Sequence, residues 1–206
     1  MPLELPPTKS ALLYLRRQLR FIEQGHDMLE RKRELLTLVV RERLKDYRAR
    51  RALAQQALAG AYRWLGIAEL RMGGHVLEQL AVGLEPALAV SILPRSSVGV
   101  EYPTVSVDIL PGRPVALMWT DPSFDAARAS LLDLVALLAR LGEAETALRR
   151  LLLEERKTQK RVNALRYNVI PRHRRRLAEI EAVLAEEERM SRFLLQRFQA
   201  EAIAGP

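Results

Sequence analysis

Few residues in this sequence have the types and spacing that catalysis or metal binding needs. The three histidines, His26, His75 and His173, have no second ligand at the spacing of a metal site. There is no cysteine, which excludes disulfides, a thiol nucleophile and a cysteine-based zinc site. The phosphate-binding pattern G-x-x-x-x-G-K-[ST] is absent, so the chain should not bind or hydrolyse nucleotide by itself. We therefore predict no catalytic residue, no metal ligand and no cofactor.

The carboxylates and tryptophans are also better explained by structure than by chemistry. Residues 186–188, three consecutive glutamates, form a surface run on an expected helix rather than a pair of acids in a pocket. Trp64 and Trp119 are expected to anchor packing, and Trp119 could also serve a protein interface, where tryptophan is enriched. His26 and His173 fall at positions of the expected helices where apolar residues otherwise recur to face a partner helix. This favours a role as polar residues between the helices that fix their register.

The sharpest local signal is electrostatic. Between Arg149 and Arg176, eleven residues are basic and two, Glu154 and Glu155, are acidic. The whole chain has a formal net charge of +8, so an acidic protein or a nucleic acid must be considered as a partner. The positive residues surround the expected helix and only Tyr167 could stack on bases, which disfavours single-strand binding. Duplex nucleic acid and an acidic protein sleeve both stay open.

Two long helices must position these residues. The first is predicted from Thr8, an N-cap, to about Met72, because no proline interrupts it and apolar residues recur at steps of three, four or seven. The pattern slips by one at Leu44 and re-forms at Leu58, Leu65 and Met72. A period near 3.5 predicts a partner helix alongside, and about 65 residues would span about 100 Å. The earlier seam is Leu12, Leu15, Leu19, Ile22, Leu29, Leu36 and Val40, with His26 and Arg33 in its two gaps.

The second long helix is predicted to begin at Asp121 and Pro122, an N-cap followed by a proline at the first helical position. Pro171 lies inside its pattern, where it should kink the helix and remove one backbone hydrogen bond. Because the pattern resumes in phase beyond Pro171, we expect one bent helix. The predicted seam is Leu131, Leu134, Leu138, Leu141, Leu148, Leu152, Val162, Val169, Ile180, Val183, Met190 and Leu194.

The segment between the helices has a different texture. Prolines punctuate short β-branched stretches, including residues 105–109 and 115–119, which predicts one or two hairpins. Gly73 and Gly74 end the first helix and leave a short helical piece from His75 to Val82. The predicted segments are an N-terminal helix (1–83), a hairpin segment (84–120) and a C-terminal helix (121–206).

Folding the two seams against each other gives the predicted fold. It is mainly α, a long antiparallel two-helix coiled coil with a small hairpin-containing segment at the turn end. A parallel homodimer is the rival, and it is less favoured because the central segment is too long and too strand-like for a mere interruption. The start lacks the layout of a signal peptide, and no apolar run approaches the roughly 20 residues of a membrane span. We expect a cytoplasmic protein that can sit peripherally on a membrane complex.

Two motifs resemble those of the D subunit of the vacuolar/archaeal-type (V/A-type) rotary ATPases. Residues 7–10, Gly25 and residues 29–36 match its amino-terminal pattern. Residues 160–165 followed by residues 169–171 match its most distinctive motif, although Arg166 stands where many relatives carry an acid. The motif residues are Arg161, Val162, Asn163, Ala164, Leu165, Val169, Ile170 and Pro171.

The resemblance implies a non-catalytic rotor shaft, which couples ATP hydrolysis or synthesis in a catalytic head to rotation of a membrane ion-translocating ring. The implied partners are the catalytic and non-catalytic nucleotide-binding subunits of the head, the small F subunit of the stalk and a funnel-shaped rotor subunit on the ring. Residues 98–119 would lie near the foot. The implied head contacts are Thr8, Lys9, Arg16, Arg17, Arg189, Arg192 and Arg197. The implied contacts with the F subunit are Leu58, Leu65, Met72, Leu131, Leu134 and Leu138.

Two other classes of protein stay open. A nucleic-acid-binding coiled coil would use residues 149–176, and its affinity would fall steeply with salt. A hairpin-tipped coiled-coil chaperone would have a similar outline, with apolar tips and a shorter chain. The motifs at residues 162–165 and 169–171 favour the shaft over both.

Overall fold

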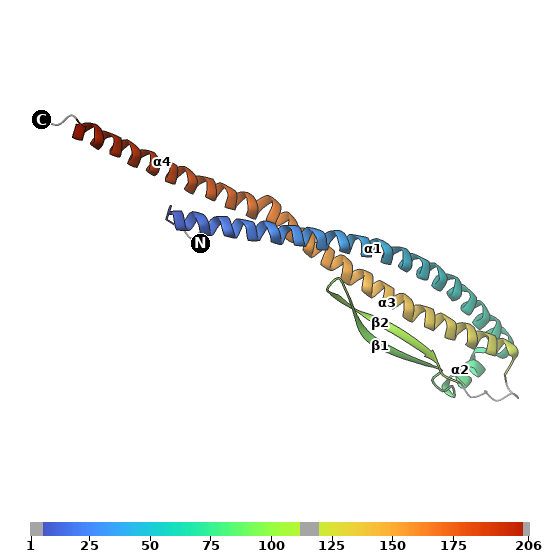
Figure 1. Ribbon diagram of the computed structural model, residues 1–206. Coiled ribbons are helices and arrows are strands. Elements are labelled where there is room, and N and C mark those ends of the chain that lie inside the picture. Colours follow the sequence, from blue (N-terminus) through green and yellow to red (C-terminus); the bar gives the residue numbers. More distant parts are fainter. Residues whose placement is uncertain (1–5, 112–119, 204–206) are drawn as a thin grey trace. The chain divides into compact units, whose positions relative to one another are not determined.

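The computed structural model describes residues 6–111 and 120–203 and confirms a mainly α fold with one small hairpin (Figure 1). The chain divides into two compact units. The terminal unit comprises Met1–Glu34 and Arg156–Pro206, and the hairpin unit comprises Leu35–Glu155. In chain order the elements are α1 (Lys9–Met72), α2 (Gly74–Val82), β1 (Leu88–Ser97), β2 (Val100–Ile109), α3 (Pro122–Ala164), the π-helical turn η1 (Leu165–Val169) and α4 (Ile170–Ile203).

Both predicted helix starts are confirmed. The Thr8 hydroxyl accepts a hydrogen bond from the Ala11 N–H at 3.2 Å, which satisfies one of the unpaired donors at the start of α1. Asp121 does the same for α3, where its carboxylate accepts from the Ser123 N–H at 3.0 Å and from the Ser123 hydroxyl. The predicted short helix after Gly73 is also present as α2, and Gly73 has a φ of 82°, which suits glycine.

The Asp121 cap makes stability depend on pH. The hydrogen bond from the Ser123 hydroxyl, then the Ser123 N–H and the Arg71 guanidinium at 3.2 Å, hold the pKa of Asp121 below its usual range. A depressed pKa stabilises the fold while the carboxylate is ionised, and this contribution is lost as pH falls through the lowered pKa. We expect Asp121→Ala to lower the unfolding midpoint at neutral pH, by a margin that shrinks below about pH 4. Thermal unfolding across pH would test this, with the exposed Asp133→Ala as a control expected to change little.

In the terminal unit, α1 and α4 run antiparallel and three ion pairs connect them at heptad intervals. Lys9 pairs with Glu188 at 2.8 Å, Arg16 with Glu181 at 2.6 Å, and Glu23 with Arg174 at 2.6 Å. The hydrogen bond and charge of Glu188 raise the pKa of Lys9, and Lys9 lowers the pKa of Glu188. Exposed pairs add little stability individually, but their spacing fixes the register of the two helices. The buried side chains of this unit are Ala11, Leu15, Thr158, Val162, Ile170 and Ile180.

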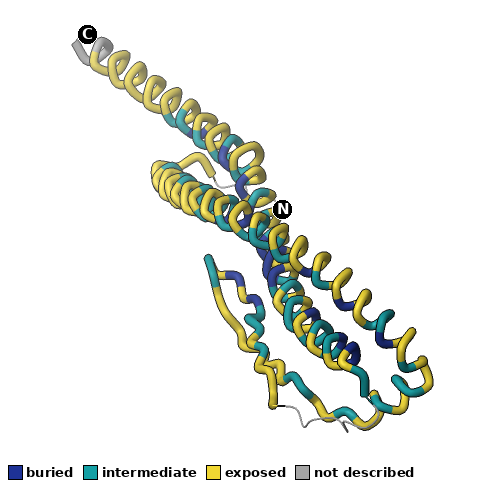
Figure 2. Tube along the Cα trace, turned by 90° about the vertical axis from the view of Figure 1, so that its right-hand side faces the viewer, coloured by how far each residue is buried: buried dark blue, intermediate teal, exposed yellow. Residues whose placement is uncertain are grey.

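The predicted seam is confirmed in the first half of α1, whereas in the second half Leu65 and Met72 are half-buried and Leu58 is exposed. Leu15, Leu36 and Val40 are buried. Beyond them the expected Leu58 is exposed, and alanines at heptad spacing are buried in its place (Figure 2). The prediction gave leucine more weight than alanine, whereas small side chains allow two helix backbones to approach closely. The buried alanines of α1 are Ala54, Ala61 and Ala68, and those of α3 are Ala127, Ala144 and Ala147.

Beyond Pro171 the predicted seam of the second helix is confirmed at Ile180, which is buried, but not at Val183, which is 43% exposed. Met190 and Leu194 were also expected in the seam and are exposed, but they lie beyond Glu188, which pairs with Lys9 at the start of α1. The π-helical turn η1 interrupts the α-helical pattern, and in it the Ile170 N–H bonds to the Leu165 carbonyl five residues back. An α-helix bonds four residues back, so the wider turn changes the direction of every later side chain.

The described strands form one hairpin. β1 and β2 are antiparallel, with Pro94 opposite Pro103. The turn residues Val98 and Gly99 have φ of 52° and 73°. A two-residue type I′ hairpin turn requires positive φ at both of its central residues. Counting from the turn, hydrogen-bonded residue pairs alternate with pairs that are not hydrogen-bonded, and Pro94 and Pro103 form a pair of the second kind. An N–H at either position would point away from the partner strand, so neither proline removes a hydrogen bond between the strands. Residues 115–119, also predicted as a strand, lie outside the described residues.

The hairpin begins at the turn end, as predicted, but runs back along α3 instead of forming a cap (Figure 1). Glu143 accepts a hydrogen bond from the Val105 N–H at 3.3 Å, and Arg150 donates to the Glu101 carbonyl at 2.9 Å. Val105 and Glu101 present these groups at the edge of β2 that faces away from β1. Two α3 side chains therefore satisfy backbone groups that a sheet edge leaves unpaired.

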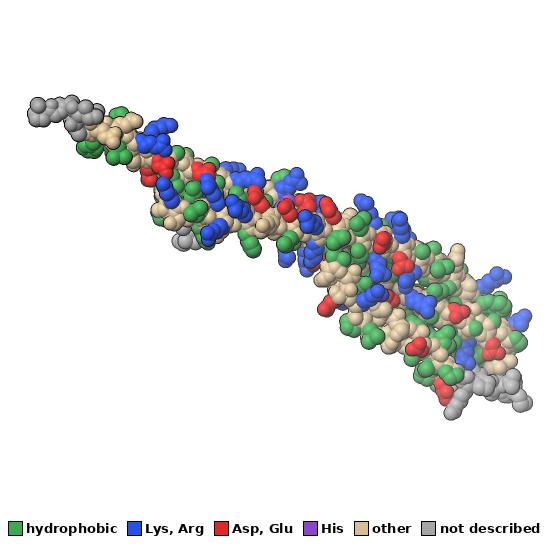
Figure 3. Space-filling view, in the orientation of Figure 1, with side chains coloured by type: hydrophobic (Ala, Val, Ile, Leu, Met, Phe, Trp, Pro, Cys, Tyr) green, Lys and Arg blue, Asp and Glu red, His purple; other side chains and the backbone are tan. Residues whose placement is uncertain are grey.

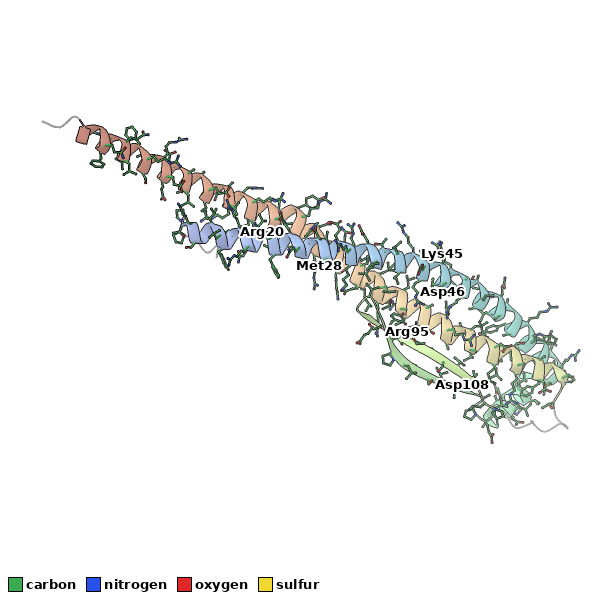
Figure 4. All side chains as sticks on the ribbon, viewed as in Figure 1. Arg20, Met28, Lys45, Asp46, Arg95 and Asp108 are labelled. Carbon is green, nitrogen blue, oxygen red and sulfur yellow. The ribbon has the colours of Figure 1, made fainter. Side chains whose placement is uncertain are left out.

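The core of the hairpin unit lies where α1, β2 and α3 meet. Leu36 and Leu151 are fully buried there. Tyr102 is also buried, and its hydroxyl accepts a hydrogen bond from Arg43 at 3.0 Å. The tip of the hairpin is thus anchored, whereas Arg95 near the tip and Asp108 near the base mark its exposed strands (Figure 4). The core cluster is Leu36, Val40, Val100, Leu148 and Leu151.

Candidate interaction surfaces

The described residues offer surfaces rather than a reactive centre. They contain no group of three or more His, Cys, Asp or Glu side chains arranged to hold a metal ion. Among the described helices, none is both long and apolar enough to cross a membrane. Figure 3 shows basic, acidic and apolar side chains interspersed on the visible face of both units.

An apolar groove in the hairpin unit has a volume of about 460 Å³. The end of α1, α2 with the residues after it, and the start of α3 form its walls. Glu78, Glu85 and Arg128 are its charged lining residues. An apolar trough with a few charged groups suits an amphipathic helix of a partner. The apolar lining is Leu65, Leu77, Ala81, Leu84, Ala87, Phe124, Ala127, Leu131, Leu132 and Val135.

The structure brings together some of the residues implied to contact the F subunit. Leu65 and Leu131 both line the groove. Leu58 and Leu138 are exposed outside it, Met72 is half-buried, and Leu134 is buried inside the hairpin unit. The predicted set therefore mixes groove residues, other surface residues and one core residue.

The far end of α4 forms a second candidate surface. Lys9 lies at the start of α1 and pairs with Glu188, so α4 continues beyond the last of the three ion pairs. Arg189 and Arg192 pair within α4, with Glu186 at 3.3 Å and Glu188 at 3.7 Å. Apolar side chains are exposed along the same stretch and need an external partner to be covered. They are Met190, Phe193, Leu194, Leu195 and Phe198.

The other implied head contacts are already used in the terminal unit. Thr8 caps α1, and Lys9 and Arg16 form the ion pairs described above. Arg17 lines a shallow depression with Phe21 and His173. Their proposed role in binding a head stays a prediction.

Acidic groups partly neutralise the basic run. Arg149 pairs with Glu145, Arg174 with Glu23 and Arg176 with Glu179, while Arg150 binds a hairpin carbonyl. A phosphate backbone would have to compete with these partners. The pairing weakens the nucleic-acid alternative.

Comparison with known proteins decides the family. A family model described as the D subunit of ATP synthase matches residues 11–200. The chain belongs to the D-subunit family of ATP synthases. The D subunit of the A-type ATP synthase of Pyrococcus furiosus is 31% identical over 202 residues, which cover 96% of this chain and 94% of that protein. The D subunit of the V-type ATP synthase of Thermotoga neapolitana is 33% identical over 201 residues, with 96% and 98% covered.

The D-subunit motif occupies the least regular part of the second helix. Val162 is buried, and Asn163 accepts a hydrogen bond from Gln159 at 2.8 Å. Leu165 to Val169 form the π-helical turn, and Ile170 is buried directly after it. Arg161 is exposed and Ala164 ends α3. In this member of the D-subunit family the motif thus coincides with the break in helix phase.

Sequence reasoning missed most of the groove of this D-subunit chain. Phe124 and the three apolar residues of the α2 region, Leu77, Ala81 and Leu84, line it and were not singled out. Their spacing of three and four residues is a one-faced helical pattern. That pattern signals an apolar face but does not say what the face meets. Trp119, the other candidate for an interface, lies outside the described residues.

Proposed function

We propose that this chain is the central rotor shaft of a V/A-type ATPase or ATP synthase and is not itself a catalyst. The observation that carries the proposal is membership of the D-subunit family together with a long pair of different helices. A shaft transmits torque through such a pair because it presents a different face to each site around it. The chain would work on the cytoplasmic side, as a peripheral part of a membrane complex.

The terminal unit supports contact with a catalytic head. The end of α4 exposes apolar and basic residues together, which suits a sleeve that is apolar with acidic points. To change the population ratio of two conformations of a binding site from 1:99 to 99:1, a partner must bind one conformation more tightly by about 5.5 kcal/mol. A few charged and apolar contacts of α4 can supply that amount. The nucleotide-binding subunits of the head are therefore the proposed partners of this unit.

The hairpin unit supports contact with the rest of the rotor. We assign the apolar groove to the F subunit of the stalk, because the groove has the shape and lining that an amphipathic helix needs. The foot of the hairpin unit would adjoin the funnel-shaped rotor protein on the membrane ring. Both assignments follow from the family and from exposed apolar surface that calls for a partner.

Immunoprecipitation of the native chain tests the shaft proposal. Antibodies raised against the whole chain would be used at about 0.15 M salt after nuclease treatment, and the partners identified by mass. We expect nucleotide-binding ATPase subunits with a small F-like protein. Recovery of partners only when nuclease is omitted would replace the shaft by a nucleic-acid binder.

Charge reversal tests the contact with the head. Replacing Arg189, Arg192 and Arg197 by glutamate should reduce coupled ATP-driven ion transport by about tenfold, because the contacts differ between conformations of the head. Folding should change little, because these side chains are exposed on α4. Transport in reconstituted vesicles and circular dichroism of the chain would measure the two effects.

The matched control reverses three exposed arginines of α1 in the hairpin unit, Arg48, Arg51 and Arg63. The control should leave coupling within about twofold of the parent. Normal coupling in the α4 variant, with normal assembly, would contradict a head contact at these residues.

A further inference from the structure

The π-helical turn η1 joins α3 and α4 into one uninterrupted helical run. The Ile170 N–H bonds to the Leu165 carbonyl, five residues back. Such single turns hold one residue more than the α-helical turn they replace, and they are often found at functional sites. The turn lies wholly within the terminal unit, where α1 covers one face of the run.

The extra residue is visible in the burial of the terminal unit. Thr158 and Val162 are buried before the turn. Steps of three and four from Val162 would continue the seam through residues 165, 169, 172, 176, 179 and 183. Beyond the turn the buried residues are Ile170 and Ile180, and the half-buried ones include His173, Leu177 and Leu184. The heptad count from Val162 therefore resumes at Ile170, eight residues later instead of seven, and from Ile170 onward every seam position lies one residue later than that count places it.

The unshifted alternative would be a poor seam. It would turn Arg172, Arg176 and Glu179 toward α1, and a charge removed from water without a matched partner is strongly unfavourable. By the same heptad count Val183, rather than Ile180, would take the seam position. In the structure Ile180 is 3% exposed and Val183 is 43% exposed. The π-helical turn therefore selects the apolar stripe of α4 that faces α1.

Pro171 follows the turn after a single residue, Ile170. In a plain α-helix a proline removes one hydrogen bond and its ring crowds the carbonyl four residues back, here that of Tyr167. The wider turn already departs from the four-residue pattern at that point. The proline and the extra residue therefore interrupt the helical hydrogen-bond pattern at the same place, not at two separate places.

We infer that Leu165–Val169 is a phase-setting turn, whose one extra residue decides which of two apolar stripes of α4 packs against α1 and which stays on the outer surface. The inward stripe contains Ile170, Leu177, Ile180 and Leu184. The outward stripe begins at Val183, which is 43% exposed beside α1, and continues through Met190 and Phe193 beyond the start of α1. The inference concerns the terminal unit alone and does not rest on the proposed shaft function.

Deleting the exposed Asn168 tests the inference. The deletion should convert the turn to plain α-helix and leave the inward stripe in place, because the residues after it already have the required phase. The full chain lacks cysteine, so the single substitutions Ile180→Cys and Val183→Cys each report the exposure of one position to a maleimide. We expect the thiol of the Ile180→Cys variant to react at least about tenfold more slowly than that of Val183→Cys, both with and without Asn168.

The matched control deletes Arg175, another exposed residue, which lies in an ordinary turn of α4. Deleting a residue from a regular α-helix rotates the residues on one side of the deletion out of the seam. The unfolding midpoint of the Arg175 deletion should therefore fall well below that of the Asn168 deletion. If neither deletion variant folds, the comparison of Ile180→Cys with Val183→Cys in the undeleted chain still decides. A protected thiol at position 183 beside a reactive thiol at position 180 in that chain, or equal losses from the two deletions, would overturn the inference.

Discussion

Replacing Leu151 by alanine should lower the free energy of unfolding by about 3 kcal/mol. Leu151 is 0% exposed in the core cluster of the hairpin unit, where it meets side chains from α1 and β2. The substitution removes buried apolar surface and leaves a cavity that three packed elements cannot easily fill. Urea unfolding of the full chain, followed by circular dichroism, would measure the change.

Leu153 provides the matched control, because it lies two residues further on α3 and is 51% exposed. The same substitution there should cost less than about 1 kcal/mol. Equal losses at Leu151 and Leu153 would mean that the hairpin does not close the core at this point. The comparison therefore tests the placement of the hairpin as well as the packing of α3.

Replacing Val135 by aspartate should weaken binding of the F subunit by about 2–4 kcal/mol, which is roughly a 30- to 1,000-fold loss of affinity. Val135 lines the apolar groove and is 44% exposed, so a carboxylate there is tolerated in the free chain but is desolvated beneath a bound helix. Calorimetric titration of the purified chain with the F subunit would give the affinity.

Leu138 is the comparison residue for this experiment. It is 45% exposed on the same helix and does not line the groove. We expect Leu138→Asp to bind the F subunit within about threefold of the parent. If Leu138→Asp lost binding while Val135→Asp kept it, the F subunit would occupy a different face of α3.

The sequence was sufficient for the elements but not for every residue that packs between them. Caps at Thr8 and Asp121, the break at Gly73 and the paired helices all follow from local chemistry, and the structure confirms them. The alanine seam of α1 was missed because alanine is common on any helix surface, and only a neighbouring helix shows which alanines are buried. The one-residue shift of the seam at Ile170 was also missed. Whether a helix adopts a π-helical turn depends on what it packs against, here α1.

The candidate surfaces were predicted less completely. Leu65 and Leu131 were named from seam spacing and both line the groove. Leu134 was named with them but is buried within the unit. The groove needs three segments that are distant in sequence, so its wall from α2 cannot be recognised from any one of them. Local periodicity identifies apolar faces, and only the tertiary fold separates those that are covered from those that are free.

The three ion pairs of the terminal unit have a mechanical consequence. Their polarity is not uniform, because α1 contributes the cation in two pairs and the anion in the third, Glu23. If α4 slid by one heptad in one direction, Glu23 would face Glu181, and in the other direction Arg16 would face Arg174. Either displacement along the helix axis puts like charges opposite each other, which is unfavourable. The two helices therefore resist shear, so that a twisting load is carried by turning the pair as a whole rather than by slippage between its strands.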